Sequence, residues 1–344
     1  EHKLGIKASP TAVLQFGDHG GAIGTLVGEE NRGLEYMFIM MNAARFGVGM
    51  QGIGLADRSY QQAVAFAKDR VQSRDLAGSP GPVSIIHHPD VRRMLMSMRS
   101  QVEAARALAY VGAGISDIAH HHPNADTRAA NLAVYEYLVP IIKGWSTEMS
   151  QDVTRDGVQV HGGMGFIEET GAAQHYRDAK ILTIYEGTTA IQANDLIGRK
   201  TVRDGGAVAK TIIAQVRVTE GQLAAAQGAD FKAIHRALCE GSSALEAVVD
   251  YVAGNMKTDI KGVFSGSVLY LKLAGIVLGG WVMARAALIA QQRLDEGTGD
   301  ASFYKAKIAT ARFFADHILS QASGLRTAII EGSAGVLALS EDQF

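Results

Sequence analysis

Residues 177–192 read RDAKILTIYEGTTAIQ. Charged residues open this segment, an apolar run follows, and Glu186 stands directly before Gly187 and the pattern of a helix start. Thr189 and Gln192 have the spacing of a capping box, in which each side chain bonds to the backbone amide of the other residue. The sequence therefore predicts that a helix begins near Thr189.

The carboxylate of Glu186 needs a separate explanation. A capping box accounts for Thr189 and Gln192, but not for an acidic residue lodged between an apolar run and a glycine. A carboxylate in apolar surroundings has its pKa raised toward neutrality, as a general base requires. The free amides of the helix start can also hold an anion or a cofactor phosphate. We therefore predict catalysis by Glu186; the alternative is that Glu186 merely precedes a well-capped helix.

Two neighbouring segments add candidate groups. Residues 159–166 read QVHGGMGF, and their glycines allow bare backbone amides to approach a ligand closely. In residues 177–180 (RDAK) the charges lie beside an apolar run, where charged side chains usually need partners. We expect an internal ion pair in that segment.

Helical periodicity dominates the chain after Asn31. Met37, Met41, Ala44 and Val48 fall on one stripe of a helix. The same patterns predict helices over about 33–71, 88–120 and 127–156, another from 189, and further helices near 207–226, 229–254, 265–294 and 302–322. The predicted fold class is therefore mainly α.

The first 30 residues have a different pattern. Short apolar runs alternate with Ser-Pro, Gly-Asp and Gly-Gly turn signals, which predicts two or three short strands. So few strands cannot bury both faces of a sheet. We therefore expect residues 1–30 to be the remnant of a larger β domain, 31–200 to form a helical bundle with the site, and 201–344 to form an additional helical domain.

The composition excludes several classes of protein. The 344 residues carry 33 basic and 35 acidic side chains, a net charge of −2, which argues against a nucleic-acid binder. The single cysteine, Cys239, can form neither an internal disulfide nor a thiolate metal site, and it favours a reducing compartment. The most apolar stretch, residues 273–284, is shorter than the roughly 20 residues of a membrane span. We expect a soluble, cytoplasmic protein.

Two motifs resemble known binding motifs, but we expect neither to form a dinucleotide or metal site. Residues 47–52 (GVGMQG) match the dinucleotide fingerprint, but that fingerprint works only where a strand turns into a helix, and this match lies inside a helical pattern. We expect Gly47, Gly49, Gly52 and Gly54 to let another helix approach closely. Residues 120–122 are three consecutive histidines, which point in different directions on a helix and cannot share one ion. We expect them to end a helix, and we predict no metal site.

Taken together and in this order, the motifs resemble the C-terminal portion of the acyl-CoA dehydrogenase family. The motifs are PTAVLQF at 10–16, LVGEENRGL at 26–34, AKDRVQSRD at 67–75, QVHGGMGFIEE at 159–169 and RDAKILTIYEGTTAIQ at 177–192. The resemblance covers residues 1–200, and the helical extension beyond is similar to a longer subgroup of the family. It implies FAD-dependent α,β-dehydrogenation of an acyl-CoA thioester to the trans-2-enoyl-CoA.

The resemblance also implies roles for individual residues. Glu186 resembles the base that takes the α-proton while flavin N5 receives the β-hydride, and its backbone amide resembles a donor to the thioester carbonyl, which stabilises enolate charge. The remaining residues match positions that bind FAD or acyl-CoA: for FAD, Thr188 and Gln192, and on the flavin of a neighbouring subunit Arg70, Gln159, Gly162 and Gly163; for acyl-CoA, Tyr185, Gly187, Arg45 and Asn42.

The implied partners are an acyl-CoA substrate, an electron-transfer flavoprotein as electron acceptor, and further copies of the chain in a homodimer or homotetramer, within fatty acid β-oxidation. Members of the family normally carry a helical domain and most of a β domain before the segment seen here. We therefore expect the chain to be a fragment lacking that half. The alternative for this chain is an inactive or non-enzymatic helical oligomerisation module of a flavoprotein.

Overall fold

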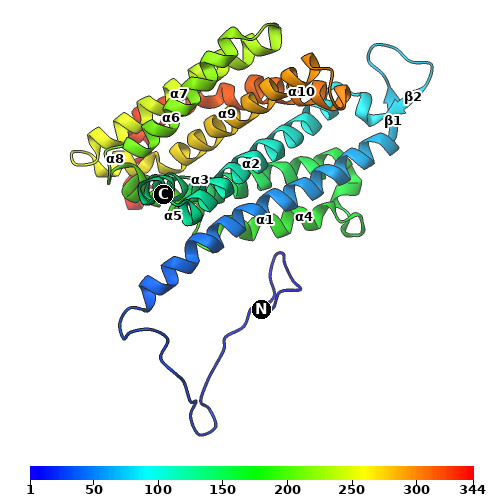
Figure 1. Ribbon diagram of the computed structural model, residues 1–344. Helices are drawn as coiled ribbons and strands as arrows, with labels where there is room; N and C mark the ends of the chain where they lie inside the picture. The colour runs from blue at the N-terminus through cyan, green and yellow to red at the C-terminus, as the bar shows by residue number, and fades with distance from the viewer.

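The computed structural model describes residues 1–344, and most of the chain is helical (Figure 1). This confirms the predicted mainly α fold. The long helices are α1 (Gly33–Asp69), α2 (Pro89–His121), α3 (Ala125–His161), α6 (Ala207–Ala225), α7 (Ala229–Asn255), α9 (Ser267–Asp295) and α10 (Ala301–His317). The shorter helices are α4 (Ala172–Lys180), α5 (Thr189–Asp195), α8 (Ile260–Ser265), α11 (Ala322–Glu331) and α12 (Ser333–Val336).

Helices α1, α2 and α3 pack along one another and form the first layer (Figure 1). Two glycines on α1 allow the closest approach: a Cβ at Gly49 would lie 3.0 Å from the Ile142 carbonyl oxygen, and one at Gly52 would lie 2.9 Å from that of Ser146. Gly47 and Gly54 face open space, so our prediction was correct for two of the four glycines and wrong for the other two. All four glycines lie inside α1. Residues 47–52 therefore do not follow a strand, and they do not form a dinucleotide-binding turn.

The second layer surrounds α9. This helix packs against α10, α7 and α11 on one side and against α2 and α3 on the other, so it joins the two layers into one core. It is long and apolar enough to cross a membrane by length and composition, but 78% of its most apolar window is buried inside the protein. It has the burial of a core helix, in agreement with the prediction for residues 273–284.

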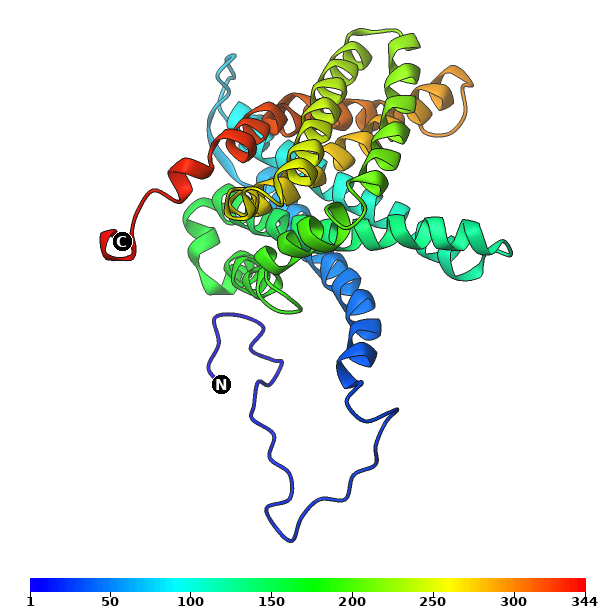
Figure 2. The ribbon, with the colours of Figure 1, turned by 90° about the vertical axis from the view of Figure 1, so that its left-hand side faces the viewer.

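Residues 1–30 form no strands, so the prediction of two or three short strands was wrong. The segment runs as an irregular loop away from the bundle (Figures 1 and 2). Val13 and Ile23 are fully exposed, because no neighbouring strand in this chain pairs with the segment. Only its beginning docks, where the Ile6 amide donates to the Asp178 carboxylate at 2.6 Å.

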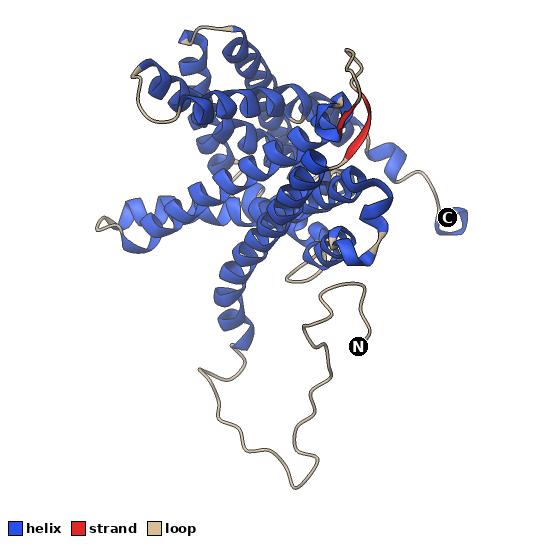
Figure 3. Cartoon of the chain, turned by 90° about the vertical axis from the view of Figure 1, so that its right-hand side faces the viewer, coloured by secondary structure: helices blue, strands red, loops and turns tan.

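The strands of the molecule lie elsewhere. β1 (Val71–Arg74) and β2 (Pro82–Ser84) pair antiparallel in a small hairpin between α1 and α2 (Figure 3). The histidine run ends α2 at His121, as predicted, and no group of three or more His, Cys, Asp or Glu side chains could hold a metal ion.

Cys239, on α7, is half-buried. Its Sγ lies 3.4 Å from Nε2 of His235, and burial, reinforced by the Glu220 carboxylate, raises the pKa of the thiol to about 11.

Candidate active site

Glu186 lies in the short loop between a 3-10 turn (Ile181–Thr183) and α5. Its backbone φ is +55° and that of Gly187 is +88°, so two successive residues adopt the left-handed conformation. Gly187 takes this conformation without a steric penalty, whereas Glu186 pays for it in strain of order 1–3 kcal/mol. A non-glycine residue held in this region indicates that the surroundings impose the conformation.

The start of α5 differs from the predicted capping box by one residue. Thr188 is the N-cap, and its hydroxyl accepts from the Ile191 amide at 3.3 Å. The Thr189 hydroxyl instead donates to the carboxylate of Glu148 on α3. The prediction failed because two adjacent threonines can both serve as a cap, and a carboxylate distant in sequence captures the second one.

Two buried side chains bind the backbone carbonyls of the Glu186 loop. Nζ of Lys143, on α3, donates to the carbonyl oxygens of Leu182 at 2.9 Å and Gly187 at 2.7 Å. Nε2 of Gln192 donates to the carbonyl oxygens of Glu186 at 3.2 Å and Gly187 at 3.3 Å. Both side chains are completely buried. The carbonyls therefore point into the protein.

The opposite edge of the loop is open. The amides of residues 186–190 donate to no acceptor in the chain. The Glu186 side chain is half-buried rather than enclosed, so the expectation of a carboxylate lodged in apolar surroundings was wrong for this chain. Tyr185 is half-buried beside it, donates its hydroxyl to Gln51 of α1, and has its pKa raised by burial and then by Glu186.

Arg45 and Asn42 lie three residues apart on α1, and Arg45 reaches Asp195 at the end of α5. The Arg45 guanidinium pairs with Asp195 at 3.2 Å, and the side chains are only 6% and 4% exposed. Asp195 also accepts from Arg199 at 2.6 Å. Asn42 is half-buried and makes no hydrogen bond within the chain through its side chain. Arg45 is thus a buried structural cation, which leaves the CoA contact expected from the resemblance untested.

The charged segment at 177–180 pairs differently from the prediction. Arg177 makes a bidentate ion pair with Glu168, with distances of 2.6 and 2.8 Å. Asp178, the expected internal partner, instead accepts from Ile6. The expected pair within the segment does not form, because Glu168 takes both guanidinium donors of Arg177 and the Ile6 amide takes the Asp178 carboxylate.

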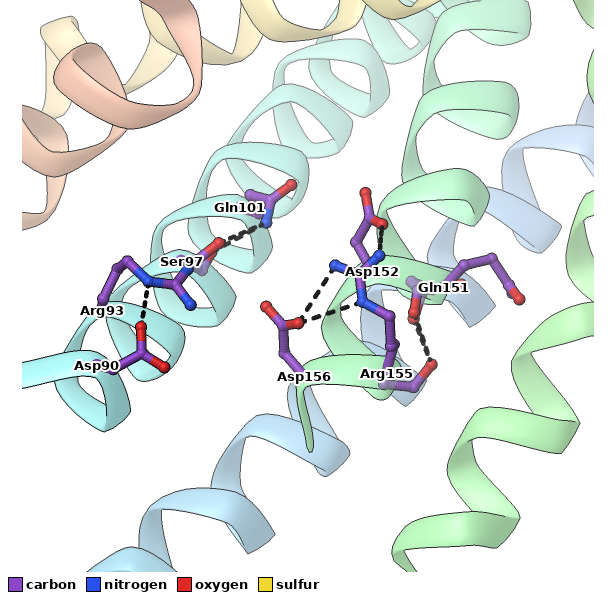
Figure 4. A network of polar contacts seen from close by, with 10 residues as sticks. Asp90, Arg93, Ser97, Gln101, Gln151, Asp152, Arg155 and Asp156 are labelled. Carbon is purple, nitrogen blue, oxygen red and sulfur yellow. Dashed lines mark hydrogen bonds and ion pairs between the residues drawn. The ribbon is translucent and has the colours of Figure 1, made fainter. Parts of the chain in front are cut away.

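A groove of about 840 Å³ adjoins the loop. It lies between α2, α3, residues 180–190, α9 and α10, and Thr188 is on its rim. Figure 4 shows its polar wall, where Arg93 pairs with Asp90 on α2, and Arg155 pairs with Asp152 and Asp156 on α3. Burial raises the pKa of Asp156.

The other predicted FAD residues lie at the far end of α1 and α3. Here the rings of Phe66 and His161 stack at 4.4 Å and bring the two helix ends together. Arg70 follows Phe66 and is exposed, as are Gln159, Gly162 and Gly163 beside His161. The structure therefore places the predicted residues in two groups, one around Glu186 and one at this exposed end.

Three residues of the site were missed from sequence. Lys143, Glu148 and Asp195 contact the loop or α5 only because α1, α3 and α5 meet. For Lys143 a signal existed, since it is the one charged residue in the apolar segment VPIIKGW at 139–145.

Family models match most of the chain. Residues 31–200 match the model described as acyl-CoA dehydrogenase, C-terminal domain, and residues 208–340 match the one described as acetyl-CoA dehydrogenase C-terminal like. The chain belongs to the acyl-CoA dehydrogenase family and contains that family's C-terminal domains.

Among curated proteins, 3-methylmercaptopropionyl-CoA dehydrogenase of Ruegeria pomeroyi is 49% identical over 99% of this chain and 57% of its own length. A broad-specificity linear acyl-CoA dehydrogenase of Mycobacterium tuberculosis is 35% identical over 100% of this chain and 58% of its own length. The chain thus spans just over half the length of these relatives. The acyl-CoA dehydrogenase of Bacillus anthracis solved with FAD shares the fold, with a TM-score of 0.74 at 19% identity, covering 100% of this chain and 57% of the other.

Proposed function

We propose that this chain supplies the catalytic base and part of the FAD site of an acyl-CoA dehydrogenase. One observation carries the proposal: Glu186 occupies a left-handed turn whose carbonyls are held inward and whose amides, including its own, are free. In this arrangement a carboxylate and a backbone donor come from a single residue.

The proposed chemistry divides between these two groups. The Glu186 amide donates to the thioester carbonyl, which stabilises the enolate charge that develops as the α-C–H bond breaks. The Glu186 carboxylate receives the α-proton as general base. Bound FAD supplies the acceptor for the hydride from the β-carbon. Tyr185 and Gly187 shape the pocket next to the reacting carbons.

The residues around the groove fit part of FAD. Lys180 and Lys272 on its lining have no carboxylate partner, and both are exposed, so they are available to a diphosphate. Thr188 presents its side chain at the same place. The Oε1 of Gln192 is buried and has no donor within the chain. Direct contacts of Thr188 and Gln192 with the flavin remain predictions.

The first test is optical. We expect the FAD-loaded protein, kept anaerobic, to lose its flavin absorbance band when a short acyl-CoA is added, because hydride transfer reduces the flavin. A flavin band that persists at saturating acyl-CoA contradicts the proposal, and enoyl-CoA formed in step with bleaching, followed by chromatography, supports it. Electron-transfer flavoprotein is the proposed acceptor that reoxidises the flavin.

The exposed group at the far end supports a flavin site that spans two copies of the chain. Arg70 has no carboxylate partner here, and it lies beside Gln159, Gly162 and Gly163. Val71, Leu76, Met164 and Phe166 are 55%, 83%, 48% and 84% exposed in the same region. An exposed apolar surface of this kind is typical of an interface between protein copies, which is consistent with the proposed homo-oligomer.

Arg70→Ala is expected to weaken FAD binding by about 10- to 100-fold, because a hydrogen bond from a charged group to a phosphate contributes roughly 1.5–3 kcal/mol. Titration of the apoprotein with FAD, followed by flavin fluorescence, measures this change. Arg326→Ala, on the exposed side of α11, is the matched control and should leave the affinity unchanged. An Arg70→Ala affinity within twofold of the unsubstituted protein contradicts the subunit-spanning site.

A further inference from the structure

Lys143 is a buried cation without a carboxylate partner. It lies in the middle of α3, its side chain is completely buried, and no ion pair includes it. Its ammonium bonds instead to two backbone carbonyls, those of Leu182 and Gly187. These carbonyls belong to the two ends of the segment that carries Glu186.

The surroundings disfavour this charge. Burial lowers the pKa of Lys143 from its ordinary value to about 8, Arg45 on α1 lowers it further, and Glu148 on α3 and Glu186 on the loop partly compensate. A buried apolar side chain of similar volume is often as stabilising as a buried ion, or more so. Stability of the bundle therefore does not explain a lysine at this position.

The conformation of the Glu186 loop gives a better explanation for a buried lysine at position 143. Glu186 and Gly187 both have positive φ, and such a turn relaxes unless neighbouring groups hold it. Lys143 joins the Leu182 carbonyl, which precedes the turn, to the Gly187 carbonyl within it. Gln192 donates to the Glu186 and Gly187 carbonyls. Glu148, five residues further along α3, holds Thr189 at the start of α5. The rigid helix α3 thus fixes both sides of the segment.

We propose that Lys143 is a positioning residue: its bonds to the Leu182 and Gly187 carbonyls set the turn so that the carboxylate and amide of Glu186 meet the thioester together. The inference rests on the proposed function of Glu186. Lys143 touches neither substrate nor flavin. It acts by keeping the free amides of the loop turned outward while the carbonyls are turned inward.

Lys143→Met in the FAD-loaded protein tests the role. We expect the rate constant of flavin reduction at saturating acyl-CoA to fall about 10- to 100-fold, because small misplacements of a catalytic group have effects of this size. FAD retention, the Kd of a non-oxidisable acyl-CoA analogue and the melting temperature should stay close to their original values. Lys143→Arg, which keeps the charge and the donors, should recover part of the lost rate.

Val153→Ala is the matched control, because Val153 is completely buried on the same helix and contacts no part of the loop through hydrogen bonds. It should lower the melting temperature without changing the rate constant. A Lys143→Met rate within threefold of the original overturns the proposal, as does a rate loss matched by an equal loss in Val153→Ala at similar stability.

If Lys143→Met does not fold, Lys143→Gln is measured with the same two criteria. The proposed function and this inference fail separately. Continued flavin reduction in Glu186→Gln would contradict the assignment of Glu186 as the base, and with it the proposed function. An unchanged Lys143→Met rate beside an inactive Glu186→Gln removes only the positioning role.

Discussion

Glu186→Gln is expected to bind FAD normally and to leave the flavin oxidised when a short acyl-CoA is added. The rate constant of flavin reduction should fall by at least about 100-fold and by up to about 10⁴-fold, the usual range for loss of a general base. Glutamine matches the size of glutamate and preserves the backbone amide, so binding of the thioester survives while proton removal does not. Anaerobic stopped-flow absorbance measures the rate.

The control for this variant is Glu169→Gln. Glu169 is exposed on the preceding segment and makes no ion pair, so its loss changes the same charge without touching the turn. It should reduce flavin at the original rate. Flavin reduction by Glu186→Gln at more than a tenth of the original rate assigns the base elsewhere.

Asp195→Ala is expected to lower the free energy of unfolding by about 3–5 kcal/mol, since it leaves a buried guanidinium without its counter-ion. Asp195 is 4% exposed and accepts from Arg45 and Arg199. Nε of Arg45 already lacks a partner, so loss of the carboxylate leaves this cation with no hydrogen bond in the chain. Urea denaturation followed by far-ultraviolet circular dichroism measures the change.

An exposed ion pair gives the comparison. Asp250 pairs with Lys210 at 2.7 Å, but the side chains are 57% and 48% exposed. Asp250→Ala should therefore change stability by no more than about 1 kcal/mol. The double variant Arg45→Met with Asp195→Leu should regain most of the stability lost in Asp195→Ala, because it removes both buried charges. A cost below about 1 kcal/mol for Asp195→Ala shows that Arg45 is hydrated or paired otherwise.

Helix periods in the sequence predicted the architecture, but the ends of the helices depend on tertiary context. α3 was expected to end near residue 156 and continues to His161, where Gly162 takes a φ of +58°. The glycines that suggested a loop therefore begin one turn later. Likewise, residues 1–30 alternate as strands do, yet an alternating pattern becomes a strand only beside another strand.

Candidate site residues could be named from the sequence where they are contiguous. Residues 185–192 follow one another in the sequence, so Glu186, Gly187 and Thr188 could be named together as candidates. The supports come from elsewhere in the chain: Lys143 precedes Gly187 by 44 positions and Glu148 precedes Thr189 by 41. Periodicity places such residues on a helix but does not say which loop they meet.

The single thiol also has a practical consequence. Burial raises the pKa of the Cys239 thiol to about 11, so very little of it is thiolate at pH 7. Maleimides and other thiol reagents will therefore react slowly with it. A cysteine introduced on an exposed position away from the proposed interface, such as Ser323 on α11, can be labelled selectively while the native thiol stays in place. The chain is thus ready for fluorescence or spin-label measurements of how copies associate.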